Sequence, residues 1–147
     1  MNSEEEVPFW IPFHGEIIPK NTVKGGKENN QKLYIGRSHH HGSLTPGKVL
    51  ESERNCIIPW GTISNVKEDF EILICSTNYN WVAAENGSVP INAFPAGHSE
   101  QGETLFIGRV FHEGSLIVGK IQQSHRVCYI PHNDEELNFC KYEVLVV

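Results

Sequence analysis

The sequence predicts an all-β fold in which two tandem, pseudo-symmetric small β units pack as one globule. Three observations support this prediction: an internal repeat, short runs of β-branched and aromatic residues, and a glycine or proline every several residues. A chain of 147 residues is long enough to bury a core without disulfide staples. No segment as long as the repeat motifs has helical periodicity.

The repeat is visible as a second copy of one sixteen-residue segment. Residues 33–48 align with residues 105–120 at an offset of 72 positions, and ten of the sixteen pairs are identical. Upstream the offset is 71, and it pairs Trp10 with Trp81. The first copy therefore lacks one residue in the loop between Gly26 and Leu33.

This alignment divides the chain into three parts. Residues 1–8 are expected to form a solvated N-terminal arm, residues 9–76 the first repeat and residues 77–147 the second. Units this small cannot bury a core alone, so we expect them to pack against each other about a pseudo-twofold axis.

Local patterns predict strands and turns inside each unit. The segments 70–74 and 142–146 are rich in β-branched and aromatic residues, which favours buried strands. The dipeptide Pro46-Gly47 predicts the centre of a type II turn, because glycine accepts the positive φ that this turn requires.

Composition excludes several classes of function. The formal net charge is −6, and no stripe of Lys and Arg is present to neutralise phosphates, which argues against nucleic-acid binding. The first residues have neither the basic start nor the apolar run of a secretory signal, and no later run is long enough to span a membrane. We therefore expect a cytoplasmic protein without membrane insertion, whose four cysteines are free thiols in a reducing compartment.

Several motifs in fixed order carry a resemblance to a known family. They are Val-Pro-x-Asn-Ala, Ala-Gly-His, Leu-Phe-Ile-Gly-Arg, His-Glu-Gly-Ser-Leu-x-x-Gly-Lys and Tyr-Glu-Val-Leu-Val in the second copy, with partial matches in the first. Together they span residues 10–147 and resemble the DM-nine repeat family, whose best-described members are mannose-binding lectins of two tandem repeats. The resemblance implies a carbohydrate-binding protein that forms homodimers, with a role in innate immune recognition.

The resemblance also implies the ligand-binding residues. In those lectins an acidic residue after the glycine pair and the lysine of the Pro-Gly-Lys segment hold the sugar. The equivalent residues are Glu28 and Lys48 in the first copy, and Ser99 and Lys120 in the second. A carboxylate can accept two vicinal sugar hydroxyls while an ammonium donates to their oxygens.

The two copies differ at the acidic position. Glu28 is one methylene longer than the aspartate expected there and lies in a loop one residue shorter. Ser99 lacks the charge and the two oxygens of a carboxylate, so the sequence favours the first site over the second unless Glu100 takes the carboxylate's place.

Each of these residues has a structural alternative. The two lysines could be ordinary surface residues, and Trp10 and Trp81 are expected to pack in the core. Trp60 has His132 as its counterpart, which leaves both a packing role and a sugar-stacking role open.

Charged and histidine residues near the repeat motifs also have alternatives. Arg37 with Glu71, and Arg109 with Glu143, are expected to form buried ion pairs, although contact with ligand stays an alternative. The run at residues 39–41 is His-His-His, but only its middle member recurs in the second copy, so we expect no metal site there.

The sequence predicts a binding protein and not an enzyme. It contains no nucleophile elbow, phosphate-binding loop or dinucleotide fingerprint, and we expect no cofactor. A glycosidase-type carboxylate pair stays open, since its separation is spatial. The main alternative to a lectin is a protein-interaction module without sugar specificity.

Overall fold

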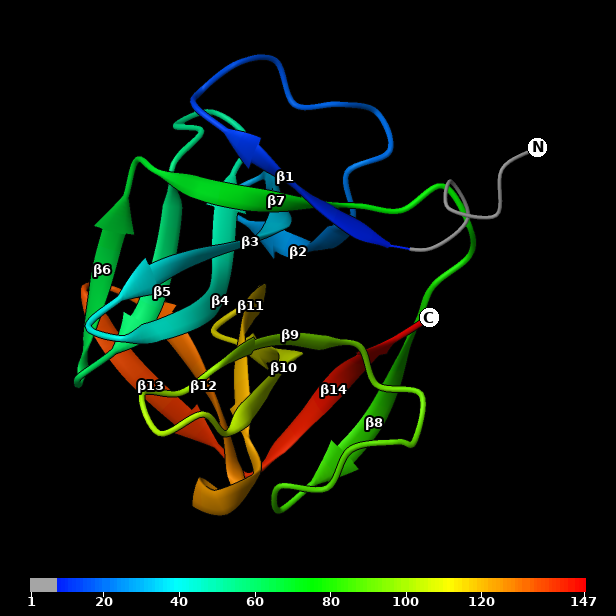
Figure 1. Cartoon of the computed structure of the whole chain (residues 1–147), viewed down its shortest axis with the longest axis vertical. Coiled ribbons are helices and arrows are strands. Elements are labelled where there is room, and N and C mark those ends of the chain that lie inside the picture. Colours follow the sequence, from blue (N-terminus) through cyan, green and yellow to red (C-terminus); the bar gives the residue numbers. More distant parts are fainter. Residues whose placement is uncertain (1–7) are drawn as a thin grey trace.

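In the described part of the chain, fourteen strands form a single hydrogen-bonded sheet system, which confirms the all-β prediction (Figure 1). The computed structural model describes residues 8–147, so the expected arm at residues 1–8 lies, apart from Pro8, outside the described residues. The strands are β1 (Phe9–Phe13), β2 (Lys24–Glu28), β3 (Gln31–His40), β4 (Ser43–Leu50), β5 (Cys56–Trp60), β6 (Ile63–Lys67), β7 (Phe70–Ile74), β8 (Asn80–Glu85), β9 (Pro95–His98), β10 (Thr104–His112), β11 (Ser115–Gln122), β12 (Val127–His132), β13 (Glu135–Phe139) and β14 (Lys141–Val146). A 3-10 turn at Gln123–His125 precedes β12. Within residues 8–147, no helix has the length and apolar character needed to cross a bilayer.

The strand pairings repeat from one copy to the next. In the first copy, β3 pairs with β2, β4 and β7, while β7 also pairs with β1. In the second copy, β10 pairs with β9, β11 and β14, while β14 also pairs with β8. The duplicated sequence therefore folds into a duplicated topology.

Reciprocal pairings join the two copies into one globule. Lys27 of β2 pairs with Leu116 of β11, and at the equivalent place His98 of β9 pairs with Leu44 of β4. These contacts close a ring of strands in the order β3, β4, β9, β10, β11, β2.

Two glycines allow this close approach. A Cβ on Gly26 would collide with the carbonyl oxygen of Leu116, and one on Gly97 would collide with the carbonyl oxygen of Leu44. The glycine of each copy therefore lets its strand reach the backbone of the other copy.

The core has three parts that follow the pseudo-symmetry. One cluster lies within the first copy and includes Ile58 and Ile72; its equivalent in the second copy includes Ile130 and Val144. A third cluster draws on both copies and contains Val23, Ile35, Leu73, Cys75, Ala96, Ile107, Val118 and Leu145. Since each copy supplies part of this shared core, neither could bury it alone.

The two predicted arginine pairs are confirmed, although they are less buried than expected. Arg37 Nε lies 2.9 Å from Glu71 Oε1, and its guanidinium stacks over the Trp10 ring at 4.1 Å. The same guanidinium donates to the carbonyl of Ala96 in the second copy. The arginine thus ties its own tryptophan, its own β7 and the neighbouring copy together.

The second copy repeats this arrangement. Arg109 Nε lies 2.8 Å from Glu143 Oε1, its guanidinium lies 4.2 Å from the Trp81 ring centroid, and it donates to the carbonyl of Gly25 in the first copy. Both tryptophans are half-buried at the edge of the shared core, as expected from packing.

The prediction of a turn at Pro46-Gly47 is wrong. Both residues lie inside β4, where a Cβ on Gly47 would collide with the carbonyl oxygen of Ile57 on β5. The chain reverses instead at His41-Gly42, where φ is 48° and 82°, and at the equivalent Glu113-Gly114. Two positive φ values suit the hairpin turns whose twist matches that of the flanking strands.

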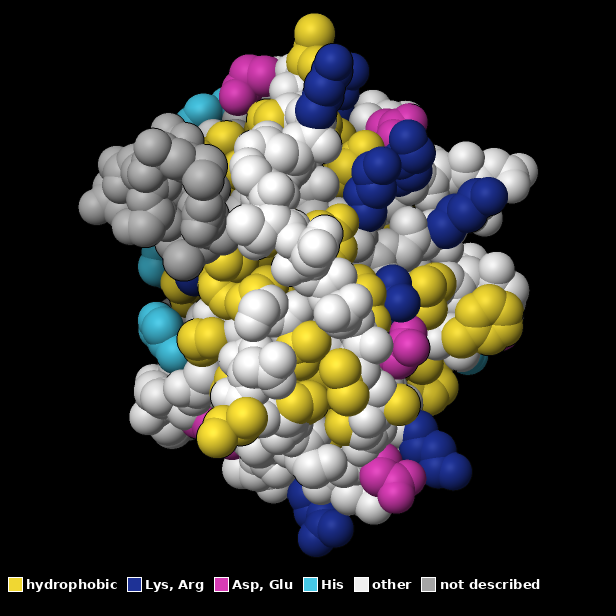
Figure 2. All heavy atoms as spheres, turned by 90° about the vertical axis from the view of Figure 1, so that its right-hand side faces the viewer, with side chains coloured by type: hydrophobic (Ala, Val, Ile, Leu, Met, Phe, Trp, Pro, Cys, Tyr) yellow, Lys and Arg dark blue, Asp and Glu magenta, His cyan; other side chains and the backbone are white. Residues whose placement is uncertain are grey.

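The sheet system ends at β1 and β8, each of which pairs with one strand only. Figure 2 shows the face that carries β8 and β14, on which hydrophobic side chains gather among uncharged ones. Val82 on β8 is 39% exposed, and Ala83 and Ala84 border a shallow depression with Tyr142.

The arginine pairs provide a matched test of the duplication. Replacing Arg37 or Arg109 with Gln removes an ion pair, a cation–π contact and a hydrogen bond to the other copy, so each variant should lose about 2 kcal/mol of unfolding free energy. Urea denaturation followed by tryptophan fluorescence measures both losses. A loss in only one variant would contradict an equivalent role in the two copies.

Candidate functional site

The structure brings Glu28 and Lys48 together. Lys48 Nζ lies 2.6 Å from Glu28 Oε1, and the two side chains are only 5% and 8% exposed. Glu28 is the last residue of β2, and the turn Asn29-Asn30, with φ of 50° and 63°, returns the chain into β3. Asparagine tolerates these positive φ values, so the shortened loop holds the carboxylate at the end of its strand, over β4.

A histidine of the second copy completes this first-copy pair. His132 Nδ1 lies 3.2 Å from Glu28 Oε2, so the two carboxylate oxygens face an ammonium and an imidazole. The opposite ring nitrogen, Nε2, lies 3.3 Å from Glu113 Oε2. The Glu28 carboxylate is therefore surrounded by groups from both copies.

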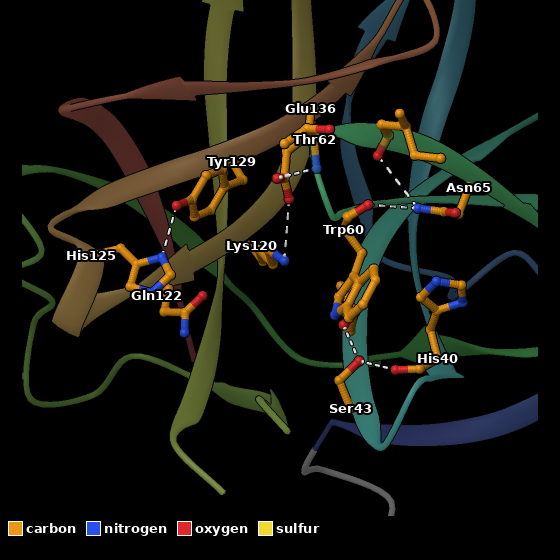
Figure 3. Close-up of polar contacts among 12 residues, drawn as sticks. His40, Ser43, Trp60, Thr62, Asn65, Lys120, Gln122, His125, Tyr129 and Glu136 are labelled. Atoms are coloured by element: carbon orange, nitrogen blue, oxygen red, sulfur yellow. Dashed lines mark hydrogen bonds and ion pairs between the residues drawn. The ribbon is translucent and has the colours of Figure 1, made fainter. Parts of the chain in front are cut away.

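Lys120 has a different carboxylate partner from Lys48. Its Nζ lies 3.3 Å from Glu136 Oε2 on β13 and 5.2 Å from the centre of the Tyr129 ring (Figure 3). Glu136 also accepts a hydrogen bond from the backbone N–H of Thr62 in the first copy. The sequence comparison missed Glu136, because its counterpart at an offset of 72 is Ser64.

A cavity of about 280 Å³ opens beside Lys120 at the junction of the two copies. Figure 3 shows Trp60 on one side of this space and Lys120, Glu136 and Tyr129 on the other. The residues that line it are Ser43, Thr45, Trp60, Gly61, Thr62, Ser99, Glu100, Gln101, Leu105, Lys120, Gln122, His125, Tyr129 and Glu136. Ser99 and Lys120, the second predicted pair, therefore line one cavity.

The second-copy loop contains three residues, Glu100 to Gly102, where the first copy has only Asn29 and Asn30. The backbone N–H of Ser99 donates to the carbonyl of Glu103, which gives Ser99 the strand-end position that Glu28 has in the first copy. Glu100 follows it and accepts a hydrogen bond of 3.1 Å from Trp60 Nε1. The carboxylate missing at Ser99 is thus supplied one residue later, on the rim of the cavity.

Trp60 is held in place by aromatic neighbours. Its ring stacks on His41 at a centroid distance of 4.7 Å and an interplanar angle of 10°, and His40 meets it edge-on at 4.8 Å. Asn65 donates to its backbone carbonyl. A planar apolar surface fixed in this way at the cavity wall is suited to stacking against a ring.

Burial changes the acidity of two groups around this cavity. Desolvation lowers the pKa of Lys120 below 10.5, and the nearby carboxylates of Glu136 and Glu100 offset only part of this effect. Desolvation, followed by the positive charge of Lys67, lowers the pKa of His40, which favours the neutral imidazole beside Trp60. The cavity therefore borders a partly desolvated ammonium, two carboxylates and aromatic rings.

The family of this protein follows from a comparison with known sequences. A family model described as DM9 repeat matches residues 2–65 and 54–139. The chain belongs to the DM9 repeat family. The tandem DM9 repeats fold as one globule in which each copy completes the other's core.

Two relatives extend this comparison. Natterin-4 of Thalassophryne nattereri is 28% identical over 148 residues, which cover 94% of this chain and 33% of Natterin-4. The crystal structure of the nematode sperm cell motility protein MFP2B aligns with a TM-score of 0.71 at 13% identity, covering 97% of this chain and 47% of that chain. This DM9 chain thus spans about a third and about half of these two proteins, and the second likeness shows the fold alone.

The buried pair of the first copy predicts a specific stability pattern. Replacing Lys48 with Met leaves the Glu28 carboxylate buried without its ammonium partner and with the His132 imidazole as its remaining side-chain contact, which should cost about 3 kcal/mol of unfolding free energy. The double variant with Glu28→Gln removes the orphaned charge and should recover most of this loss. Urea denaturation of both variants measures the difference, and a double variant no more stable than Lys48→Met would contradict the explanation.

Proposed function

We propose that this DM9 protein is a non-enzymatic carbohydrate-binding protein whose open site is the cavity beside Lys120. The observation that carries the proposal is the composition of that cavity, in which an ammonium, two carboxylates and a fixed indole surround a space of about 280 Å³. Membership of the DM9 family, with its lectin-like members, supports the same class of ligand.

The chemistry of the cavity suits vicinal hydroxyl groups. Lys120 can donate to a sugar oxygen, and the carboxylates of Glu136 and Glu100 can accept from neighbouring hydroxyls. The indole of Trp60 offers an apolar face to the C–H groups of a pyranose ring. Ser43 and Thr45 also line the cavity, and their hydroxyls hydrogen-bond to each other.

The Glu28–Lys48 pair of the first copy is a second possible sugar-binding position, but its polar groups are already paired. The Glu28 carboxylate already accepts from Lys48 and faces His132, so a sugar must compete with these partners. The sequence favoured this position because it keeps the carboxylate. Lys120 is also paired with Glu136, but its longer ion pair borders an open cavity, which favours the second copy as the ligand site.

The remaining parts of the proposal come from the family resemblance. Mannose and mannose-rich glycans are the first ligands to test, and innate immune recognition is the proposed role. We propose a homodimer because paired shallow sites gain avidity, and the free edge of β8 with its apolar face offers a surface for a second copy. The free thiols of all four cysteines agree with the proposed cytoplasmic location.

Two matched lysine variants test the proposed site. Lys120→Ala should lower the affinity for mannose at least about tenfold, because it removes a charge-assisted hydrogen bond from the open cavity. Lys48→Ala should change it less than threefold at the same fraction of folded protein. Calorimetric titration with mannose, preceded by a glycan array, measures both.

The reverse ranking of the two variants would move the site to Glu28 and Lys48. If both variants bind mannose as tightly as the wild type, neither lysine belongs to the binding site. A glycan array without any specific signal would overturn the lectin proposal and favour the protein-interaction module.

The lowered pKa of Lys120 predicts an alkaline limit on sugar binding. Only the protonated amine of Lys120 can donate a charge-assisted hydrogen bond to the sugar. The affinity for mannose should therefore be highest at the lower end of the pH range and fall as the pH rises through the pKa of Lys120, which lies below 10.5. Lys120→Arg keeps its charge throughout this range and should shift the loss to higher pH. Affinities measured from about pH 7 to about pH 10 test this, and identical profiles for the two proteins would contradict it.

A further inference from the structure

Three metal-ligand side chains meet at the opposite end of His132 from Glu28. His112, the last residue of β10, Glu113 in the following turn and His132, the last residue of β12, place one ligand atom each within 4.8 Å of one another. Glu113 Oε2 lies 3.3 Å from His132 Nε2, and its Oε1 lies 3.8 Å from His112 Nε2. The Glu113 carboxylate thus bridges two Nε2 atoms that face the same point.

The contacts of His132 allow a cation at this point. Its Nδ1 and Nε2 both face carboxylate oxygens, at 3.2 Å and 3.3 Å. A neutral imidazole has one N–H, so the tautomer that donates from Nδ1 to Glu28 turns its Nε2 lone pair toward Glu113. Two lone pairs face each other there unless a proton or a metal ion lies between them.

We propose that His112, Glu113 and His132 form a binding site for a zinc-like divalent ion. Two imidazole nitrogens and one carboxylate are the ligands of open zinc sites, in which water takes the remaining position. The Nδ1–H of His132 then donates to Glu28, which orients the ring as outer carboxylates commonly do for metal-bound histidines. Ligand distances of about 2.0–2.2 Å require the three groups to contract slightly, and Glu113, whose side chain is 65% exposed, has room to move.

The duplicated fold supplies a natural comparison for this site. At an offset of 72, His40, His41 and Trp60 occupy the positions of His112, Glu113 and His132. In the first copy these three rings pack on one another, and the indole of Trp60 has no lone pair to offer an ion. The same three positions therefore hold packed aromatic rings in the first copy and three possible metal ligands in the second.

The charge of the surroundings also suits a divalent ion. Glu28 and Glu113 contribute two negative charges around His132, and Lys48 neutralises one of them. Imidazole nitrogen together with carboxylate oxygen selects late first-row ions such as zinc and cobalt over calcium or magnesium.

Calorimetric titration of the full-length protein with zinc chloride at neutral pH tests the proposal. We expect one saturable zinc ion per chain in the wild type, with the affinity lowered at least tenfold in His112→Gln and in Glu113→Gln. His40→Gln, the matched change in the first copy, should leave the affinity unchanged. Both altered ligands lie at the surface end of a hairpin, and thermal melting without zinc verifies that the variants fold.

A second measurement reports the ligands directly. Cobalt added in place of zinc should give the visible absorption of a low-coordinate site in the wild type and in His40→Gln, but not in His112→Gln. Lowering the pH should release the ion as the imidazoles take up protons.

Three outcomes would overturn the proposal. The first is no saturable zinc binding, and the second is zinc binding that survives both His112→Gln and Glu113→Gln. The third is an equal loss in His40→Gln, which would place the ion at the first-copy histidines. His132 belongs to this metal site and also contacts Glu28 in the first-copy sugar position. The two proposals are tested by different measurements, zinc binding and mannose binding, so either can fail without the other.

Discussion

The close approach of one glycine in each copy to the other copy's backbone is the constraint on which this structure depends. Gly26 and Gly97 allow β2 and β9 to reach the strands β11 and β4 of the other copy. This exchange closes the ring of strands, buries the shared core and brings each loop next to a lysine. A side chain at either glycine would collide with a backbone carbonyl, which cannot move without breaking the strand pairing.

The same exchange makes both candidate sugar-binding positions products of the two copies. Glu28 of the first copy meets His132 of the second, and Trp60 of the first meets Glu100 of the second. Duplication thus provides two equivalent junctions, and substitution at a few positions has given them different properties. Both junctions contain a buried lysine–glutamate pair, and the pair at Lys120 borders a cavity.

Glu28 links the features of the first junction. Its two carboxylate oxygens face Lys48 and His132, and His132 faces Glu113 in turn. Any group that binds at one end of this chain of contacts changes the charge seen at the other, because the intervening side chains are nearly excluded from water. A ligand at Lys48 and a cation at Glu113 are therefore coupled through one carboxylate.

The sequence by itself determined the duplication, the all-β class and the equivalence of residues between copies. Repeat positions such as Lys48 and Lys120 could be aligned, and the arginine pairs could be anticipated, because a charge kept at a strand position in both copies needs a partner. The resemblance placed Glu28 with Lys48, and the structure puts them 2.6 Å apart.

Only the tertiary structure decided which groups that are distant in sequence meet. Glu136, Glu100 and His132 reach their partners across 16 to 104 residues of sequence in contacts that no local pattern encodes. The turn expected at Pro46-Gly47 failed for the same reason, since the glycine there serves a close approach to β5 and not a positive φ. Local sequence specifies conformational preference, whereas the packing of one copy on the other determines the neighbours of each side chain.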